Sequence, residues 1–285
     1  MSLDIGTALS EGGRRTFTRN GLLLVCAFAL IGLVSTVATQ TLLADFFDSF
    51  LELMRANRGT GDGEFTRRQI RTFETLFRGQ TPFALSIPTA GAWGLFLLTA
   101  VFGETTTLVA IRVFVSEHTG LSRGLVRRNI LVATANGIVG GIVVLVVITI
   151  GGVIGLVGLL IGGPIVAAFL AMSFLFMRQE IAVEDENFVD AMADSWTLAK
   201  GNRLSLLALV ILVVITVAIA ASVPPLVLGF VNSTVGVLAG ILAGGVTAAF
   251  GTAVVTRAYA QLRAERDAET EPTAEWATDR PTRGV

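Results

Sequence analysis

Four long stretches without a charged residue or a histidine decide what this chain folds into. They cover residues 21–44, 79–103, 129–177 and 204–256. A helix crosses the hydrocarbon of a bilayer with about 20 apolar residues, so each of the two longest stretches holds two crossings. Charged residues make up 15% of the chain, whereas soluble domains carry about 25%. The sequence therefore predicts an all-α, polytopic membrane protein.

The breaks inside the two longest stretches predict six spans that form three hairpins. In 129–177 the chain turns between Gly151 and Pro164, where paired glycines interrupt the helix. In 204–256 we expect the turn at Pro224-Pro225, because proline fits poorly inside a helix. The predicted spans are 21–44, 84–111, 129–152, 155–177, 204–223 and 233–256.

The positive charges predict the orientation of these spans, since cytoplasmic connections carry an excess of arginine and lysine. With the N-terminus inside, the inner segments hold 15 such residues and the outer segment 45–83 holds six, offset by six acids. This predicts a multi-pass protein of the cell membrane with a cytoplasmic N-terminal segment 1–20, a membrane domain 21–257 and a cytoplasmic, largely disordered tail 258–285. The segment 45–83 is expected to form an external helical hairpin, either a packed cap or a lid.

The composition argues against several classes of function. A net charge of −1 provides no basic field for nucleic acid. The only cysteine, Cys26, and the only histidine, His118, are too few for a zinc site of His and Cys ligands. No nucleophile and base stand out as a pair. We therefore expect no catalytic residue, no metal and no cofactor, with membrane lipids as partners and no nucleic acid.

Residues 187–200 predict an amphipathic helix at the inner membrane interface. Asn187 suits the N-cap and Gly201 suits the end of the helix. Its apolar face carries Phe188, Met192 and Trp196 at helical spacing. Residues 4–18 repeat this pattern more weakly. The candidate interfacial motif consists of Ser195, Trp196, Lys200, Asn202 and Arg203, of which Lys200 and Arg203 are expected to meet lipid phosphates.

Polar residues within the apolar stretches are the remaining candidates for function. Glu104 suits either a proton- or cation-coupling carboxylate or a local partner of threonine hydroxyls or an arginine. Gln40, Asn136 and Asn232 are expected to form hydrogen bonds between helices. Small residues four apart let helices approach closely, within the chain or in a homo-oligomer. They are Gly236, Gly240 and Gly244 in the last span and Gly137 and Gly141 in the third.

The stretch Val183-Glu184, Asp190-Ala191, Ser195-Trp196 and Lys200-Gly201-Asn202, followed by an apolar helix, resembles a broad family of six-span membrane proteins. That family includes the membrane domain found beside some glycerophosphodiester phosphodiesterases and many haloarchaeal proteins of unknown function. The resemblance covers the six spans but not segment 45–83. It implies the fold and topology, and it does not imply hydrolysis. A chain with one lysine among 21 basic residues also fits a halophilic archaeon.

Two hypotheses for function follow from these observations. The first is a non-catalytic membrane protein with a structural, membrane-organising or lipid-associated role. The alternative is a small-solute or ion transporter or a channel subunit, with Glu104 and the asparagines along its path. A water-filled cavity that reaches Glu104 would favour transport, and a dry interior packed with glycine would favour the first hypothesis.

Overall fold

A computed structural model describes residues 3–56, 67–78, 81–116, 128–158 and 162–270. In these residues every regular element is a helix. Six segments are long and apolar enough to cross a membrane, which confirms the predicted fold class. They are Arg19–Ala56, Thr89–Val115, Ile130–Leu156, Gly162–Val183, Arg203–Gly229 and Ser233–Glu269.

The described helices fall into two parts of the chain. The first part of the chain forms α1 (Ile5–Thr16), α2 (Arg19–Ala56), α3 (Arg67–Arg78) and α4 (Thr89–Val115). The second part forms α6 (Ile130–Gly158), α7 (Gly162–Ser173), α8 (Met177–Val183), α9 (Phe188–Ala199), α10 (Arg203–Gly229) and α11 (Ser233–Thr270).

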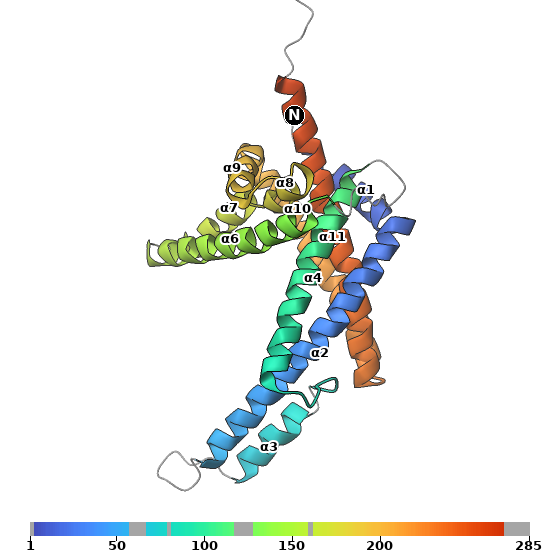
Figure 1. The fold of residues 1–285 in the computed structure, drawn as a ribbon, viewed down its shortest axis with the longest axis vertical. Coiled ribbons are helices and arrows are strands. Elements are labelled where there is room, and N and C mark those ends of the chain that lie inside the picture. The colour runs from blue at the N-terminus through green and yellow to red at the C-terminus, as the bar shows by residue number, and fades with distance from the viewer. Residues whose placement is uncertain (1–2, 57–66, 79–80, 117–127, 159–161, 271–285) are drawn as a thin grey trace, which may run out of the picture.

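Helix α11 is the central element of the arrangement. It packs against α10, α2, α1 and α4, and α2 also packs against α4. Helices α6 and α7 pack against each other and form a hairpin that stands at a wide angle to α2 and α4 (Figure 1). Small residues allow this close pairing, because a Cβ atom on Gly155 would lie only 2.7 Å from the carbonyl oxygen of Gly162.

Three shorter helices, α1, α8 and α9, gather at the end of the bundle where the last turns of α11 lie (Figure 1). Leu3, before α1, shares a buried core cluster with Leu198 of α9 and Leu262 of α11. The beginning of the chain and the C-terminal half of α11 therefore lie at the same end of the bundle.

Helix α1 lies directly on the backbone of α11. A Cβ atom on Gly12 would lie 2.5 Å from Val254 Cγ2 and 2.9 Å from Val254 Cα. Asp4 caps the helix, because its Oδ1 atom accepts a hydrogen bond of 2.9 Å from the Thr7 backbone N–H. The backbone N–H and the hydroxyl of Thr7 hold the pKa of Asp4 below its ordinary value.

The turn predicted at Pro224-Pro225 is wrong, because α10 continues through both prolines to Gly229. A proline in a helix removes one hydrogen bond to the preceding turn. Here both prolines lie in the last turns of α10, where few such bonds remain to be lost. The chain turns instead at residues 230–232, and Asn232 caps α11 by accepting from the N–H groups of Thr234 and Val235.

The first half of the segment predicted as an external hairpin continues the first span. Helix α2 runs without a break to Ala56, and α3 packs along its last turns. Leu51 and Met54 of α2 form a small buried cluster with Ile70 of α3. Residues 57–66, between α2 and α3, lie outside the described residues. Of the predicted tail 258–285, residues 258–270 continue α11 as a helix, and residues 271–285 lie outside the described residues.

Candidate functional site

A buried carboxylate, Glu180 of α8, forms the centre of a polar network at the end of the bundle where α1, α8 and α9 gather. Its side chain is fully buried. The Tyr259 hydroxyl of α11 donates a hydrogen bond of 3.0 Å to Glu180 Oε2. Arg263, one turn further along α11, lies 3.3 Å from the same oxygen and 3.4 Å from Glu184. The network thus ties α8 to α11 by a charge-assisted contact.

Two further acids lie beside Glu180. The three acids are close enough to share a cation: each offers one carboxylate oxygen, and these oxygens lie within 4.8 Å of one another. They belong to Glu180, Glu186 and Asp194. Burial, helped by the neighbouring charges of Asp194, Glu180 and Glu184 and opposed by Arg263, raises the pKa of Glu186 to about 7. Arg266 lies 3.9 Å from Asp194. Arginines of α11 thus supply positive charge to a group of acids that has the spacing of a cation site.

Glu180, Tyr259 and Arg263 are not among the site residues that the sequence predicted. Two signals in the sequence could have identified the first two. Tyr259 is the only tyrosine of the chain, and Glu180 lies three residues after the end of the uncharged stretch 129–177. The contact between them joins residues 79 positions apart, a pairing that helical periodicity does not predict.

A second buried charge, Arg112 of α4, connects three segments. Its Nε atom donates to the Ala182 carbonyl at 2.7 Å, and its two terminal nitrogens donate to the Arg128 carbonyl at 2.6 Å and to Asp185 at 3.0 Å. Asp185 also pairs with the more exposed Arg128 side chain at 2.5 Å. Every nitrogen of the Arg112 guanidinium therefore has a carbonyl or carboxylate partner, which offsets the cost of burying its charge.

Glu104 pairs with an arginine, one of the two roles that the sequence left open. Arg178 Nε of α8 lies 2.8 Å from Glu104 Oε1 of α4. The glycines of α6 make room for this pair, since a Cβ atom on Gly137 would lie 2.5 Å from Glu104 Oε1 and one on Gly141 would lie 3.4 Å from an Arg178 nitrogen. The predicted glycine stripe of the third span thus accommodates an ion pair.

The three predicted polar residues of the spans contact different kinds of partner. Asn136 joins two helices, because its Oδ1 atom accepts a hydrogen bond of 3.3 Å from the Phe188 N–H at the start of α9. Gln40 Oε1 accepts from the Phe83 N–H at 2.8 Å, which fixes the segment before α4 against α2. Asn232 caps its own helix, α11, in place of the interhelical bond that we expected.

The candidate interfacial motif divides into residues that face the core and residues that face away from it. Ser195 is fully buried, and its hydroxyl donates to the Ser173 carbonyl and accepts from the Phe176 N–H. Trp196 is 37% exposed and packs against Phe169 and Phe174. Lys200 is exposed, and Asn202 precedes α10 without a side-chain capping bond. The guanidinium of Arg203 lies over the rings of Phe169 and Trp196.

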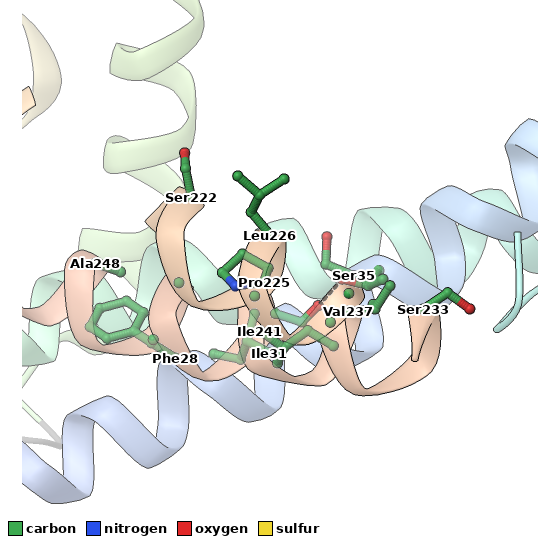
Figure 2. A pocket seen from close by; sticks show the side chains of 17 residues that line it. Phe28, Ile31, Ser35, Ser222, Pro225, Leu226, Ser233, Val237, Ile241 and Ala248 are labelled. Atoms are coloured by element: carbon green, nitrogen blue, oxygen red, sulfur yellow. Dashed lines mark hydrogen bonds between the residues drawn. The ribbon is translucent and has the colours of Figure 1, made fainter. Parts of the chain in front are cut away.

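The glycines of the last span line an open groove between α2, α10 and α11, with a volume of about 860 Å³ (Figure 2). We call it the α2–α10–α11 groove. Gly236 and Gly240 contact the end of α10 near Pro225, whereas a Cβ atom on Gly244 would meet no atom within 4 Å. The lining is apolar apart from four hydroxyl-bearing side chains. The lining also includes Phe28, Ile31, Ser35, Thr36, Ser222, Leu226, Ser233, Val237, Ile241 and Ala248.

Comparison with known proteins identifies one family. A family model described as a domain of unknown function (DUF7847) matches residues 3–262, from just before α1 to the Tyr259 turn of α11. No curated protein and no solved structure matches the chain.

Proposed function

The chain belongs to this family, and we propose that it is a non-catalytic membrane protein that holds hydrocarbon chains of membrane lipids in the α2–α10–α11 groove. The groove itself is the observation that carries the proposal. Its volume of about 860 Å³ falls within the roughly 300–1,000 Å³ of sites for small ligands. It lies between three helices that are apolar enough to span a membrane, so lipid is the surrounding solvent.

The depth of the groove follows from the sequence of α11. Gly236, Gly240 and Gly244, with Ala248 after them, form its floor on one face of that helix. Side chains that would fill the space are absent at these positions. Phe28 and Ile31 of α2 and Pro225 of α10 form the sides (Figure 2). A flexible hydrocarbon chain suits such a surface, because it gains dispersion contacts along a floor that offers no polar partner.

The polar groups of the described residues support a non-catalytic role. The buried Ser195 hydroxyl forms hydrogen bonds with two backbone groups. Glu104 pairs with Arg178, and Glu180 pairs with Tyr259 and Arg263. These contacts suit ties between helices. The relation to membrane domains beside phosphodiesterases, the haloarchaeal origin and the cytoplasmic termini remain predictions from the sequence.

Lipids with a photoreactive diazirine in the acyl chain test the proposal in proteoliposomes. Gly244→Leu places a branched side chain in the groove, at a position where a Cβ atom would meet nothing within 4 Å. We expect this variant to lose most of the labelling of α2 and α11 residues around the groove. Gly94→Leu on α4 is the matched control, because its Cβ atom also meets nothing within 4 Å and lies on an exposed surface.

Equal labelling of the groove in wild type and Gly244→Leu would contradict the proposal. If a second copy of the chain filled the groove, Gly244→Leu would instead change the oligomeric mass in detergent and leave lipid labelling as it was. Solute uptake that depends on Glu104 and is lost in Glu104→Gln would favour the transporter alternative.

A further inference from the structure

Arg203, the first residue of α10, lies against two aromatic rings from other helices. Its guanidinium carbon lies 4.4 Å from the ring centre of Phe169 in α7 and 4.7 Å from that of Trp196 in α9. The two rings also contact each other edge to face, with centres 5.6 Å apart. Cation–π contacts of this kind orient a guanidinium, so α7 and α9 hold Arg203 in a defined position.

No protein carboxylate neutralises this guanidinium among the described residues. Its Nε and one terminal nitrogen are buried from solvent and have no hydrogen-bond partner. Other arginines of the same end differ, since Arg112, Arg257 and Arg263 each face an acid. Of the two acids in the neighbouring α9, Asp194 faces Arg266, and Asp190 accepts a hydrogen bond from the Asn187 side chain. A partly buried charge without a counter-ion is costly, so the arrangement calls for an anion from outside the chain.

An apolar pocket of about 430 Å³ adjoins Arg203 between α7 and α10. Apart from Arg203, its lining contains only hydrocarbon and thioether side chains. Several of them, including Ile165 and Leu204, are largely exposed on the membrane-spanning surface. The pocket is lined by Pro164, Ile165, Ala168, Met172, Leu204 and Leu207, together with Phe169. A small inorganic anion would leave this space empty, whereas a hydrocarbon chain would fill it.

The position along the chain agrees with a lipid headgroup at Arg203. The uncharged stretch 204–256 begins immediately after it, and the exposed Lys200 precedes it by one turn. The Asn202 side chain does not cap α10, so the first N–H groups of this long helix add positive potential at the same place.

We propose that Arg203 and the adjoining pocket bind one anionic membrane lipid, with the headgroup phosphate on the guanidinium and a hydrocarbon chain between α7 and α10. This site is separate from the α2–α10–α11 groove and does not depend on the function proposed for it. The Arg203 site selects lipids by the charge of the headgroup, whereas the apolar α2–α10–α11 groove binds hydrocarbon chains irrespective of that charge.

Quenching of Trp196 fluorescence by brominated lipids tests this proposal. Trp93→Phe and Trp276→Phe leave Trp196 as the single tryptophan of the full-length chain, and excitation at the red edge of the tryptophan absorption band avoids Tyr259. In nanodiscs we expect brominated phosphatidylglycerol to reach half-quenching at an about fivefold lower mole fraction than brominated phosphatidylcholine, the factor expected for one arginine near an anionic lipid. In Arg203→Gln this preference should disappear.

Two controls separate the site from general charge effects and from unfolding. Arg14→Gln removes an exposed charge of α1 at the same end and should keep the preference. Arg203→Lys retains the charge and should keep part of the preference for phosphatidylglycerol, which would show that the pocket still forms. Gly244→Leu should keep the full preference, because it changes the groove and not the Arg203 site. Failure of the groove proposal is therefore distinguishable from failure of the lipid-headgroup proposal.

The proposal would be overturned by equal quenching from the two lipids in the parent protein, or by a preference that survives in Arg203→Gln. Displacement of the phosphatidylglycerol preference by free inorganic phosphate would also overturn it, because the site would then recognise the anion without the chain.

Discussion

At the residue scale, the charges of this chain are organised in pairs that join distant segments. The sequence shows which charged residues adjoin the apolar stretches, and it correctly marks Glu104 as one that needs a partner. It does not show that Arg178 is that partner or that Gly137 leaves room for both. Those facts depend on how α4, α6 and α8 pack, since the partners lie 74 positions apart.

Glu186 gives the protein a dependence of stability on pH. Its pKa in the folded protein is raised from 4.5 to about 7, so the protonated form favours the folded state. This contribution is fully present below the ordinary pKa and is lost as the pH rises through 7. We therefore expect the thermal midpoint in detergent to fall between pH 4.5 and pH 7, and Glu186→Gln to flatten this part of the profile.

Glu269→Gln, at an exposed position near the end of α11, is the matched control for loss of one negative charge. It should keep the pH profile of the wild type. An unchanged profile in Glu186→Gln would show that another group governs stability in this pH range.

At the element scale, the predicted helices are largely correct, and their contacts are less so. Apolar stretches determine where a helix crosses a membrane, which is why six spans were found. A glycine repeat shows which face of α11 is small, but the sequence does not show which helix packs there. Gly245, outside the predicted stripe, makes the closest approach to α2, and Gly244 faces open space in the groove. The prolines of α10 similarly lie near a helix end without causing the turn.

Alanine substitutions at these two neighbouring glycines should have different effects. A Cβ atom on Gly245 would lie 2.8 Å from Ala29 Cβ and 2.8 Å from the Val25 carbonyl oxygen, so it would separate α11 from α2. Overpacking of this kind costs about 1–3 kcal/mol. We expect Gly245→Ala to lower the free energy of unfolding by this amount and Gly244→Ala to leave it unchanged or slightly higher, measured by denaturation in detergent. Equal effects would contradict the helix contact described here.

At the scale of the whole molecule, the six candidate spans are an even number, which predicts that both ends of the chain lie on one side of the membrane. The core cluster shared by Leu3 and Leu262 agrees with this count. The side itself follows only from the arginine and lysine excess of the sequence, because a helical bundle has the same contacts in either orientation. The short helices α1, α8 and α9 gather at the end that this excess assigns to the cytoplasm.

Reporter fusions test the orientation directly. A fusion at the N-terminus and one after Val285 should report the cytoplasm, and an insertion at residue 60 should report the outside. The physical reason is the retention of positively charged connections on the cytoplasmic side. An outside C-terminus together with an inside N-terminus would be incompatible with six crossings.

The length of α11 has a consequence for the charge near its end. The uncharged part of this helix ends at Thr256, and the helix continues without a break to Thr270. At 1.5 Å per residue, these 14 steps extend about 21 Å along the helix axis. The Debye length in physiological salt is about 8 Å, so Thr270 lies more than two such lengths from the level of Thr256. Salt therefore screens Glu269, one residue before the end of α11, from lipid headgroups at the level of Thr256, and its electrostatic effect is confined to whatever approaches the protein from the aqueous side.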